Sequence, residues 1–205
     1  MFLAFIMSSL AQIDIWEPSS LRQQFHKKRI EYIVATFGDV PYGHTIYGEL
    51  QAAEPADACK QLTPINHNKS MGQLIVFAER GGCHFSQKVI NAQKIGAGMV
   101  IIGDYIDESI EGIILVEKDR QLFSKINIPS ILIKKRDGEV LKTVLQGNEQ
   151  IILAVNFEQI DISEKAQMTF ILQADSQKSY DAIIHFEPIY KTLKDHIKLD
   201  VGYKI

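Results

Sequence analysis

Two apolar runs in the middle of the chain constrain its fold more than any other feature. Gln73–Ala78 and Gly98–Ile102 are almost continuously apolar, which is typical of strands buried on both faces of a sheet. A turn and a short amphipathic segment lie between them. A strand, a helix and a strand within so few residues predict two parallel strands joined by a helical crossover.

The segment between the runs is predicted to be a helix with one apolar face. Its apolar stripe consists of Phe85, Val89 and Ala92. The side chains expected to face water are Lys88, Asn91 and Lys94. Gly96 is well placed to end the helix, because glycine readily adopts the left-handed conformation that often follows a helix.

The turn before this helix contains Arg80, Gly81 and Gly82, followed by Cys83. Two glycines let the backbone approach a ligand closely and leave backbone N–H groups free to donate hydrogen bonds. An arginine can hold a carboxylate or a peptide carbonyl group. A recognition loop is therefore one interpretation, and a tight turn with a solvated arginine is the other.

Further strands and one more helix are predicted on either side of this unit. The strands are residues 29–36, 45–50, 128–133 and 150–157. The helix is expected from about Gly138 to Gln146, with Asp137 as its N-cap and Gly147 at its end. Residues 37–43, which include Tyr42, are predicted to form a turn, and the polar residues 51–71 a surface loop.

A second unit is predicted after residue 157. Residues 158–166 are polar and linker-like, a strand is expected at 167–173, a helix at 179–194 and a last strand at 198–205. Pro188 should interrupt that helix unless the helix is kinked or consists of two pieces. A segment of this size buries little core unaided, so we expect it to pack on the first domain or to begin a larger one.

The composition predicts a soluble, globular chain. The formal charge of −3 is small and mixed in sign, which argues against nucleic acid or an anionic membrane as a partner. Residues 1–11 are apolar and end in small residues, which favours a secretory signal peptide, although a buried N-terminal strand is the alternative. No other segment has the length of apolar sequence that a membrane span needs.

Cys59 and Cys83 are the only cysteines. In a secreted chain they are expected to form one disulfide, and two independent buried thiols are the alternative. Asn68-Lys69-Ser70 is an N-glycosylation sequon within the same loop, which agrees with that compartment.

The sequence contains no motif that indicates catalysis. It lacks a nucleophile elbow, a zinc-protease helix, a Cys-x-x-Cys pair and a phosphate-binding loop. Its six histidines are scattered and none has metal-ligand spacing. The acidic cluster consists of Asp104, Asp107, Glu108 and Glu111, and its spacing favours a solvated loop over a calcium site. We therefore expect neither an enzyme nor a bound cofactor or metal.

One longer pattern closely resembles the signature of the protease-associated (PA) domain. It is Arg80-Gly-Gly-Cys83-x-Phe85-x-x-Lys88-x-x-Asn91-Ala92-Gln93-x-x-Gly96-Ala97, followed by Val100-Ile101-Ile102. The segments Phe37-Gly38-Asp39-Val40-Pro41-Tyr42-Gly43 and Ile128-Pro129-Ser130 are similar to the PA domains of plant-type vacuolar sorting receptors and of receptor-like ubiquitin ligases. The resemblance covers roughly residues 20–157.

The resemblance implies a mixed α/β fold, with an open β-barrel or sandwich flanked by short helices. It implies a non-catalytic, lumenal module that binds peptide or protein cargo and in which a Cys59–Cys83 bond braces the loop. The peptide contacts carried over are Arg80, Gly81, Gly82 and, from the upstream turn, Tyr42. The implied location is the lumen of the Golgi, endosome or vacuole, or the outside of the cell.

The resulting domain prediction is a signal peptide at 1–11, a PA domain at 20–157, a linker at 158–166 and a partial thioredoxin-like βαβ unit at 167–205. No cysteine follows the 167–173 strand, so this unit is not expected to exchange thiols. The alternative function is that of a PA-domain piece of a secreted peptidase or of a receptor-like ubiquitin ligase.

Overall fold

A computed structural model describes residues 12–25, 29–107, 109–110, 122, 124–157, 166–173 and 176–204. The chain divides into two compact units, Met1–Ile160 and Asp161–Ile205. The predicted signal peptide at 1–11 and most of the predicted linker at 158–166 lie outside the described residues.

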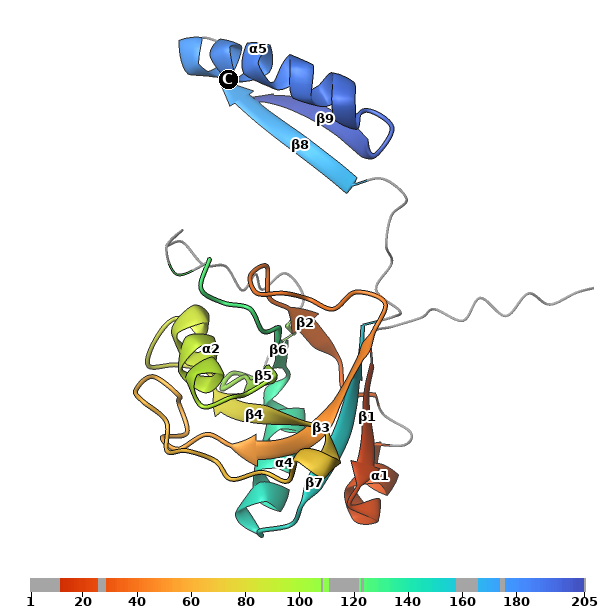
Figure 1. Cartoon of the computed structure of the whole chain (residues 1–205), viewed down its shortest axis with the longest axis vertical. Helices are drawn as coiled ribbons and strands as arrows, with labels where there is room; N and C mark the ends of the chain where they lie inside the picture. Colours follow the sequence, from red (N-terminus) through yellow and green to blue (C-terminus); the bar gives the residue numbers. More distant parts are fainter. Residues whose placement is uncertain are drawn as a thin grey trace, which may run out of the picture. The chain divides into compact units, whose positions relative to one another are not determined.

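The first unit contains a curled seven-stranded sheet with helices packed against it (Figure 1). Its elements are β1 (Gln12–Glu17), α1 (Ser19–Phe25), β2 (Tyr32–Val34), β3 (Thr45–Ala52), the 3-10 helix η1 (Lys69–Met71), β4 (Gln73–Glu79), α2 (Phe85–Lys94), β5 (Met99–Gly103), β6 (Ser130–Ile133), α4 (Lys135–Gln146) and β7 (Ile151–Asn156). The mixed α/β class agrees with the sequence prediction. The strand β1 lies before residue 20 and belongs to this sheet.

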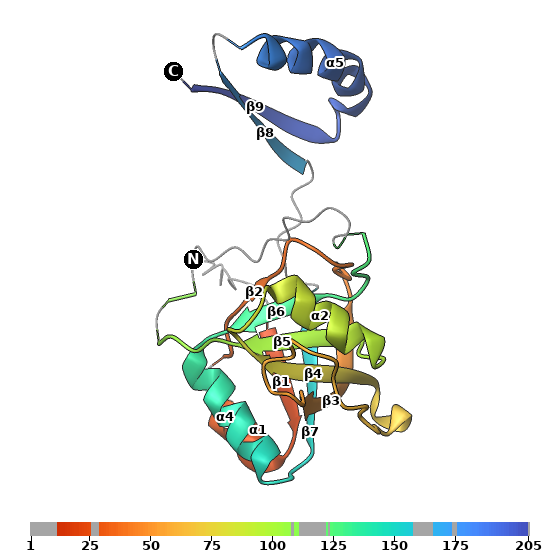
Figure 2. The same cartoon turned by 90° about the vertical axis from the view of Figure 1, so that its left-hand side faces the viewer.

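The strand order is β1-β7-β3-β4-β5-β6-β2. The four strands from β3 to β6 are parallel, while β7 runs antiparallel to β3 and β2 antiparallel to β6. The predicted crossover is confirmed, since β4 and β5 are parallel neighbours joined by α2 (Figure 2). All four parallel strands therefore end at the same edge of the sheet.

Alternation along the strands separates two hydrophobic cores. On β4, Ile75 and Phe77 belong to the core that includes Leu141 of α4. Leu74, Val76 and Ala78 of the same strand belong to the core that includes Val89 and Ala92 of α2. The two helices thus cover opposite faces of the parallel strands.

Three local predictions need correction. Lys88 and Asn91 do not face water, because both are buried, at 0% and 4% exposure. The helix α4 begins at Lys135 with Lys134 as its N-cap, so Asp137 is not the N-cap and lies buried in the first turn. The predicted strand at 29–36 is reduced to Tyr32–Val34, because the chain turns into bends at residues 36–38.

The second unit is a βαβ unit of β8 (Ala166–Gln173), α5 (Gln177–Leu193) and β9 (Ile197–Lys204). The strands β8 and β9 are parallel and pair along their full length. The helix α5 continues through Pro188 as one element.

Candidate functional site

The conspicuous loop of the sequence lies at the carboxyl ends of the parallel strands. The last residues of β4, β5 and β6 are in register, with Glu79 paired to Gly103 and Gly103 to Ile133. The backbone N–H of Arg80 donates to Gly103 O at 2.9 Å, so the loop begins in contact with the neighbouring strand. In open α/β sheets this edge is where ligands usually bind.

Arg80 forms an ion pair with Asp104, the residue that follows β5. Arg80 Nη1 lies 2.7 Å from Asp104 Oδ2. The Asp104 side chain is 0% exposed and that of Arg80 is 22% exposed. Asp104 Oδ1 also accepts hydrogen bonds from the backbone N–H groups of Tyr105 and Ile106, at 2.7 and 3.2 Å. Asp104 is therefore not part of a solvated acidic loop as the sequence suggested.

Two aromatic rings flank the Arg80 guanidinium. Its Cζ atom lies 5.7 Å from the centre of the Phe85 ring and 5.3 Å from that of Tyr105. Cations are attracted to aromatic faces at such distances. Arg80 is thus held by an internal carboxylate and two rings, and only its remaining N–H groups are available to a ligand.

Different features of the structure favour glycine at the two positions after Arg80. Both have positive φ angles, +105° for Gly81 and +76° for Gly82. A Cβ atom on Gly81 would meet no heavy atom within 4 Å, whereas one on Gly82 would lie 2.9 Å from Cys59 Sγ. Gly82 is therefore required both by its backbone conformation and by the close approach of the Cys59 side chain.

A disulfide joins Cys59 and Cys83, with their Cα atoms 5.6 Å apart. It links the loop after β4 to the polar segment after β3. The Cys59 N–H also donates to Asp57 Oδ1 at 3.0 Å. The disulfide therefore fastens the loop to its neighbour covalently, while the Cys59–Asp57 hydrogen bond holds the segment after β3 in place.

Lys88 lies beneath the disulfide. Its Nζ donates hydrogen bonds to the carbonyl oxygens of Asp57 and Gly81 and lies 3.4 Å from Cys59 Sγ. Burial lowers the pKa of Lys88, while the nearby Asp57 and Glu79 carboxylates oppose that shift. This buried amine connects three segments that are separate in sequence.

Asn91 has a similar role one turn later in α2. Its Nδ2 donates to Ala58 O at 2.9 Å, next to the disulfide. Sequence reasoning missed both Lys88 and Asn91 because polar residues beside an apolar stripe are normally assigned to water. A signal was present, since Lys88 precedes the buried Ala92 by four residues and therefore lies on nearly the same helix face.

A solvent-facing cavity of about 620 Å³ adjoins the loop and is lined by Gly82, Cys83, His84 and Gln87. Among the described residues, no group accepts a hydrogen bond from the backbone N–H of Gly81, Gly82 or His84. The His84 side chain makes no capping bond at the start of α2. Two of these unpaired N–H groups, those of Gly82 and His84, belong to residues that line the cavity, and such donors are suited to bind carbonyl or carboxylate oxygens.

The other two predicted site residues lie elsewhere. Tyr42 is 54% exposed in the turn before β3, at the opposite end of that strand from the loop. Asn68 is exposed, and its Oδ1 accepts hydrogen bonds from Ser70 N and Ser70 Oγ at 3.0 and 2.8 Å. The structure brings together Arg80, Gly81, Gly82 and the disulfide, and it does not bring Tyr42 to them.

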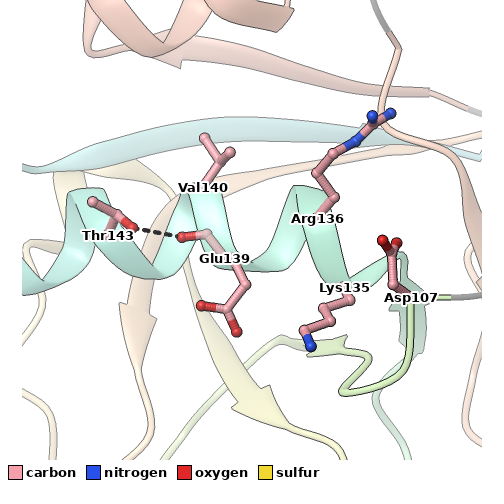
Figure 3. Close-up of a pocket in the computed structure, with 6 residues that line it drawn as sticks. All are labelled: Asp107, Lys135, Arg136, Glu139, Val140 and Thr143. Atoms are coloured by element: carbon pink, nitrogen blue, oxygen red, sulfur yellow. Dashed lines mark hydrogen bonds between the residues drawn. The ribbon is translucent and has the colours of Figure 1, made fainter.

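A second cavity, of about 400 Å³, lies beside α4 (Figure 3). Its charged lining residues are Asp107, Lys135, Arg136 and Glu139. Lys135 and Arg136 point in opposite directions in Figure 3, so they do not converge on one anion. The balance of charges favours no particular class of ligand.

Within the part of the chain that the structure describes, no group of three His, Cys, Asp or Glu side chains is arranged to hold a metal ion. None of the helices in that part has the length and apolar character to cross a membrane.

Comparison with known proteins identifies the family of this fold. Residues 46–141 match the PA domain family. Together with the curled sheet and the braced loop, this match shows that the chain contains a PA domain. This confirms the family predicted from the loop sequence.

The curated relatives include sorting receptors and a ubiquitin ligase. Vacuolar-sorting receptor 5 of Arabidopsis thaliana is 29% identical over 157 residues, which are 74% of this chain and 24% of the receptor. Vacuolar-sorting receptor 1 of Pisum sativum is 30% identical over 161 residues, 74% of this chain and 26% of the receptor. The E3 ubiquitin-protein ligase RNF13 of Bos taurus is 31% identical over 116 residues, 52% of this chain and 30% of the ligase. The chain thus spans about a quarter of the length of these receptors.

Among solved structures, a zinc aminopeptidase from Bacillus subtilis shares the fold. The TM-score is 0.50 at 17% sequence identity, and the match covers 82% of this chain and 38% of the aminopeptidase. This likeness concerns the fold alone.

Proposed function

We propose that this PA domain is a non-catalytic, lumenal module that binds peptide segments of protein cargo, with the loop Arg80–Gly82 as its binding edge. The relatives reported above include two vacuolar-sorting receptors, and that similarity supports a receptor-like role. The disulfide and the exposed Asn68 sequon agree with an oxidising compartment.

The main support for the proposal is that the backbone N–H groups of Gly82 and His84, two residues that line the cavity, are unpaired in the described part of the chain. A peptide offers a carbonyl oxygen at every residue, and each can accept from one of these donors. Arg80 adds positive charge at the edge, although Asp104 already binds one of its nitrogens. The proposed contacts are therefore mainly backbone to backbone, and Tyr42 remains a separate prediction.

A pair of His84 variants tests the role of the backbone donors. His84 has φ −63° and ψ 151°, a conformation that proline adopts without strain. His84→Pro removes one unpaired N–H, while His84→Ala removes only the side chain. Affinity for labelled peptides, first selected from a random library on the wild-type protein, would be measured by fluorescence anisotropy.

We expect His84→Pro to bind about tenfold more weakly than His84→Ala, because one hydrogen bond is lost. Near-UV circular dichroism and the urea midpoint would verify that both variants remain folded. Equal affinity of the two folded variants would contradict the assignment of the loop. Failure of the wild-type protein to select any peptide would contradict the cargo-binding proposal itself.

A further inference from the structure

A cavity of about 240 Å³ lies between α4 and the carboxyl ends of β3 and β4. Its apolar lining consists of Ala52, Ala53, Ala56, Phe77 and Leu145. Ligand pockets for whole small molecules usually measure about 300–1,000 Å³. The smaller volume here fits a single side chain better than a complete ligand.

The cavity and the loop both adjoin the carboxyl end of β4. Glu79 lines the cavity and directly precedes Arg80. The Glu79 N–H donates to Ala56 O at 2.8 Å, which holds one wall of the cavity against the end of β4. Because side chains alternate along a strand, Phe77 and Glu79 face α4, whereas Ala78 and Arg80 face α2. A bound peptide would therefore have to cross the edge of the sheet at residues 79–80 to contact both places.

The rim of the cavity has unequal charges. Lys142 Nζ lies 2.6 Å from Glu79 Oε1, so these two charges compensate each other. Glu54 also lines the cavity and is exposed, and no ion pair binds its carboxylate among the described residues. The rim therefore favours a cationic group beside the apolar interior.

We propose that this cavity is a subsite for one aliphatic side chain, such as leucine, whose neighbouring group carries a positive charge. The inference rests on the proposed function, because it assigns this side chain to the peptide that binds at the Arg80 loop. Backbone contacts at the loop accept almost any sequence, and the aliphatic subsite supplies a preference among peptides.

Leucinamide is a suitable probe, since it combines an aliphatic side chain with an ammonium group and does not need the loop. It would be titrated into protein with ¹³C-labelled Ala and Leu methyl groups, with glycinamide as the matched probe without a side chain. We expect leucinamide, and not glycinamide, to shift the methyl signals of Ala52, Ala53, Ala56 and Leu145. Equal shifts with both probes, or none at these methyl groups, would overturn the subsite.

A filling variant connects the subsite to peptide binding. Ala52 is exposed at the end of β3, so Ala52→Leu should occupy the cavity without disturbing the core. Thr45→Leu, at the exposed other end of β3, is the matched control. We expect Ala52→Leu to abolish the leucinamide shifts. It should also lower the affinity for peptides with an aliphatic residue in the cavity about tenfold, while the affinity for peptides with glycine at the same position should be unaffected.

The two proposals fail in different ways. If His84→Pro weakens every peptide but Ala52→Leu changes none, peptide binding stands and the subsite is wrong. If leucinamide shifts the cavity methyl groups but no peptide binds, the cargo-binding function is wrong, and with it the assignment of the aliphatic side chain to cargo.

Discussion

Arg80 and Asp104 form an ion pair, with 2.7 Å between Nη1 and Oδ2, that connects the ends of two neighbouring parallel strands. The carboxylate is shielded completely from solvent. Arg80 consequently has a structural task in addition to any contact with a ligand, and substitutions at this position affect both.

Arg80→Ala should lower the free energy of unfolding by about 2 kcal/mol, because it leaves the buried Asp104 carboxylate without its cation. Urea denaturation would measure this loss. Asp104→Asn in the Arg80→Ala background should restore part of it, since the remaining group is neutral. If Arg80→Ala is as stable as the wild-type protein, the ion pair does not contribute to stability. Arg80 would then act as a ligand contact alone.

Lys88→Met should destabilise the domain by about 1.5 kcal/mol at neutral pH, because the Asp57 and Gly81 carbonyl groups lose the Lys88 amine and, among the described residues, only Gly81 O keeps another backbone donor, the Cys83 N–H. Lys94→Met on the exposed part of α2 is the control. Burial lowers the pKa of Lys88 in the folded state below the 10.5 of a free lysine, so the unfolded chain binds the additional proton between those two values. The wild-type protein should therefore gain stability relative to Lys88→Met as the pH rises through this window, and a stability difference that falls there would contradict the burial of the amine.

Gly82→Ala should cost about 2 kcal/mol of stability, since the added Cβ meets Cys59 Sγ and the φ angle is unfavourable. Gly81→Ala has open space around the Cβ and should cost only about 1 kcal/mol, from its φ angle. Thermal unfolding of the two variants provides the comparison. A larger cost at Gly81 than at Gly82 would disprove the close packing of the loop on the disulfide.

Gln87→Glu should have opposite effects on stability and on peptide binding. A glutamate at the third position of α2 can accept from the His84 N–H, which should stabilise the helix by about 0.5 kcal/mol. The same contact occupies a donor proposed for the peptide, so the affinity should fall about fivefold. Gln87→Ala, which also loses the bond from Gln87 Nε2 to Asn91 Oδ1, is the control for stability and for anisotropy titrations. A tighter complex with Gln87→Glu would exclude the His84 N–H as a peptide donor.

The central crossover could be predicted because a strand that is buried on both faces has an almost continuously apolar sequence, as in Gln73–Ala78. The edge strand β1 was missed although Ile13 and Ile15 alternate with polar residues and are buried, which is a detectable period of two. The helix start at Lys135 was misplaced because Asp137 is a typical capping residue. Its burial within the first turn depends on packing that local propensity does not contain.

In the candidate site too, some residues could be predicted from the sequence and others could not. Gly82 and Cys83 were identified because glycine and cysteine have few alternative roles in such a turn. Lys88 and Asp104 were assigned to water, since nothing local to either residue indicates that carbonyl groups from residues 57 and 81, or the guanidinium of Arg80, will surround them. Their partners are determined by the register of the parallel strands and by the disulfide, which are tertiary properties.

The fastening of the loop by Lys88, by the disulfide and by the pair Arg80–Asp104 has a thermodynamic consequence. A loop that is already ordered loses little conformational entropy when a partner arrives. Its association should therefore resemble the docking of rigid bodies, with small structural change, and differences in affinity among ligands should appear mainly in how fast each one dissociates.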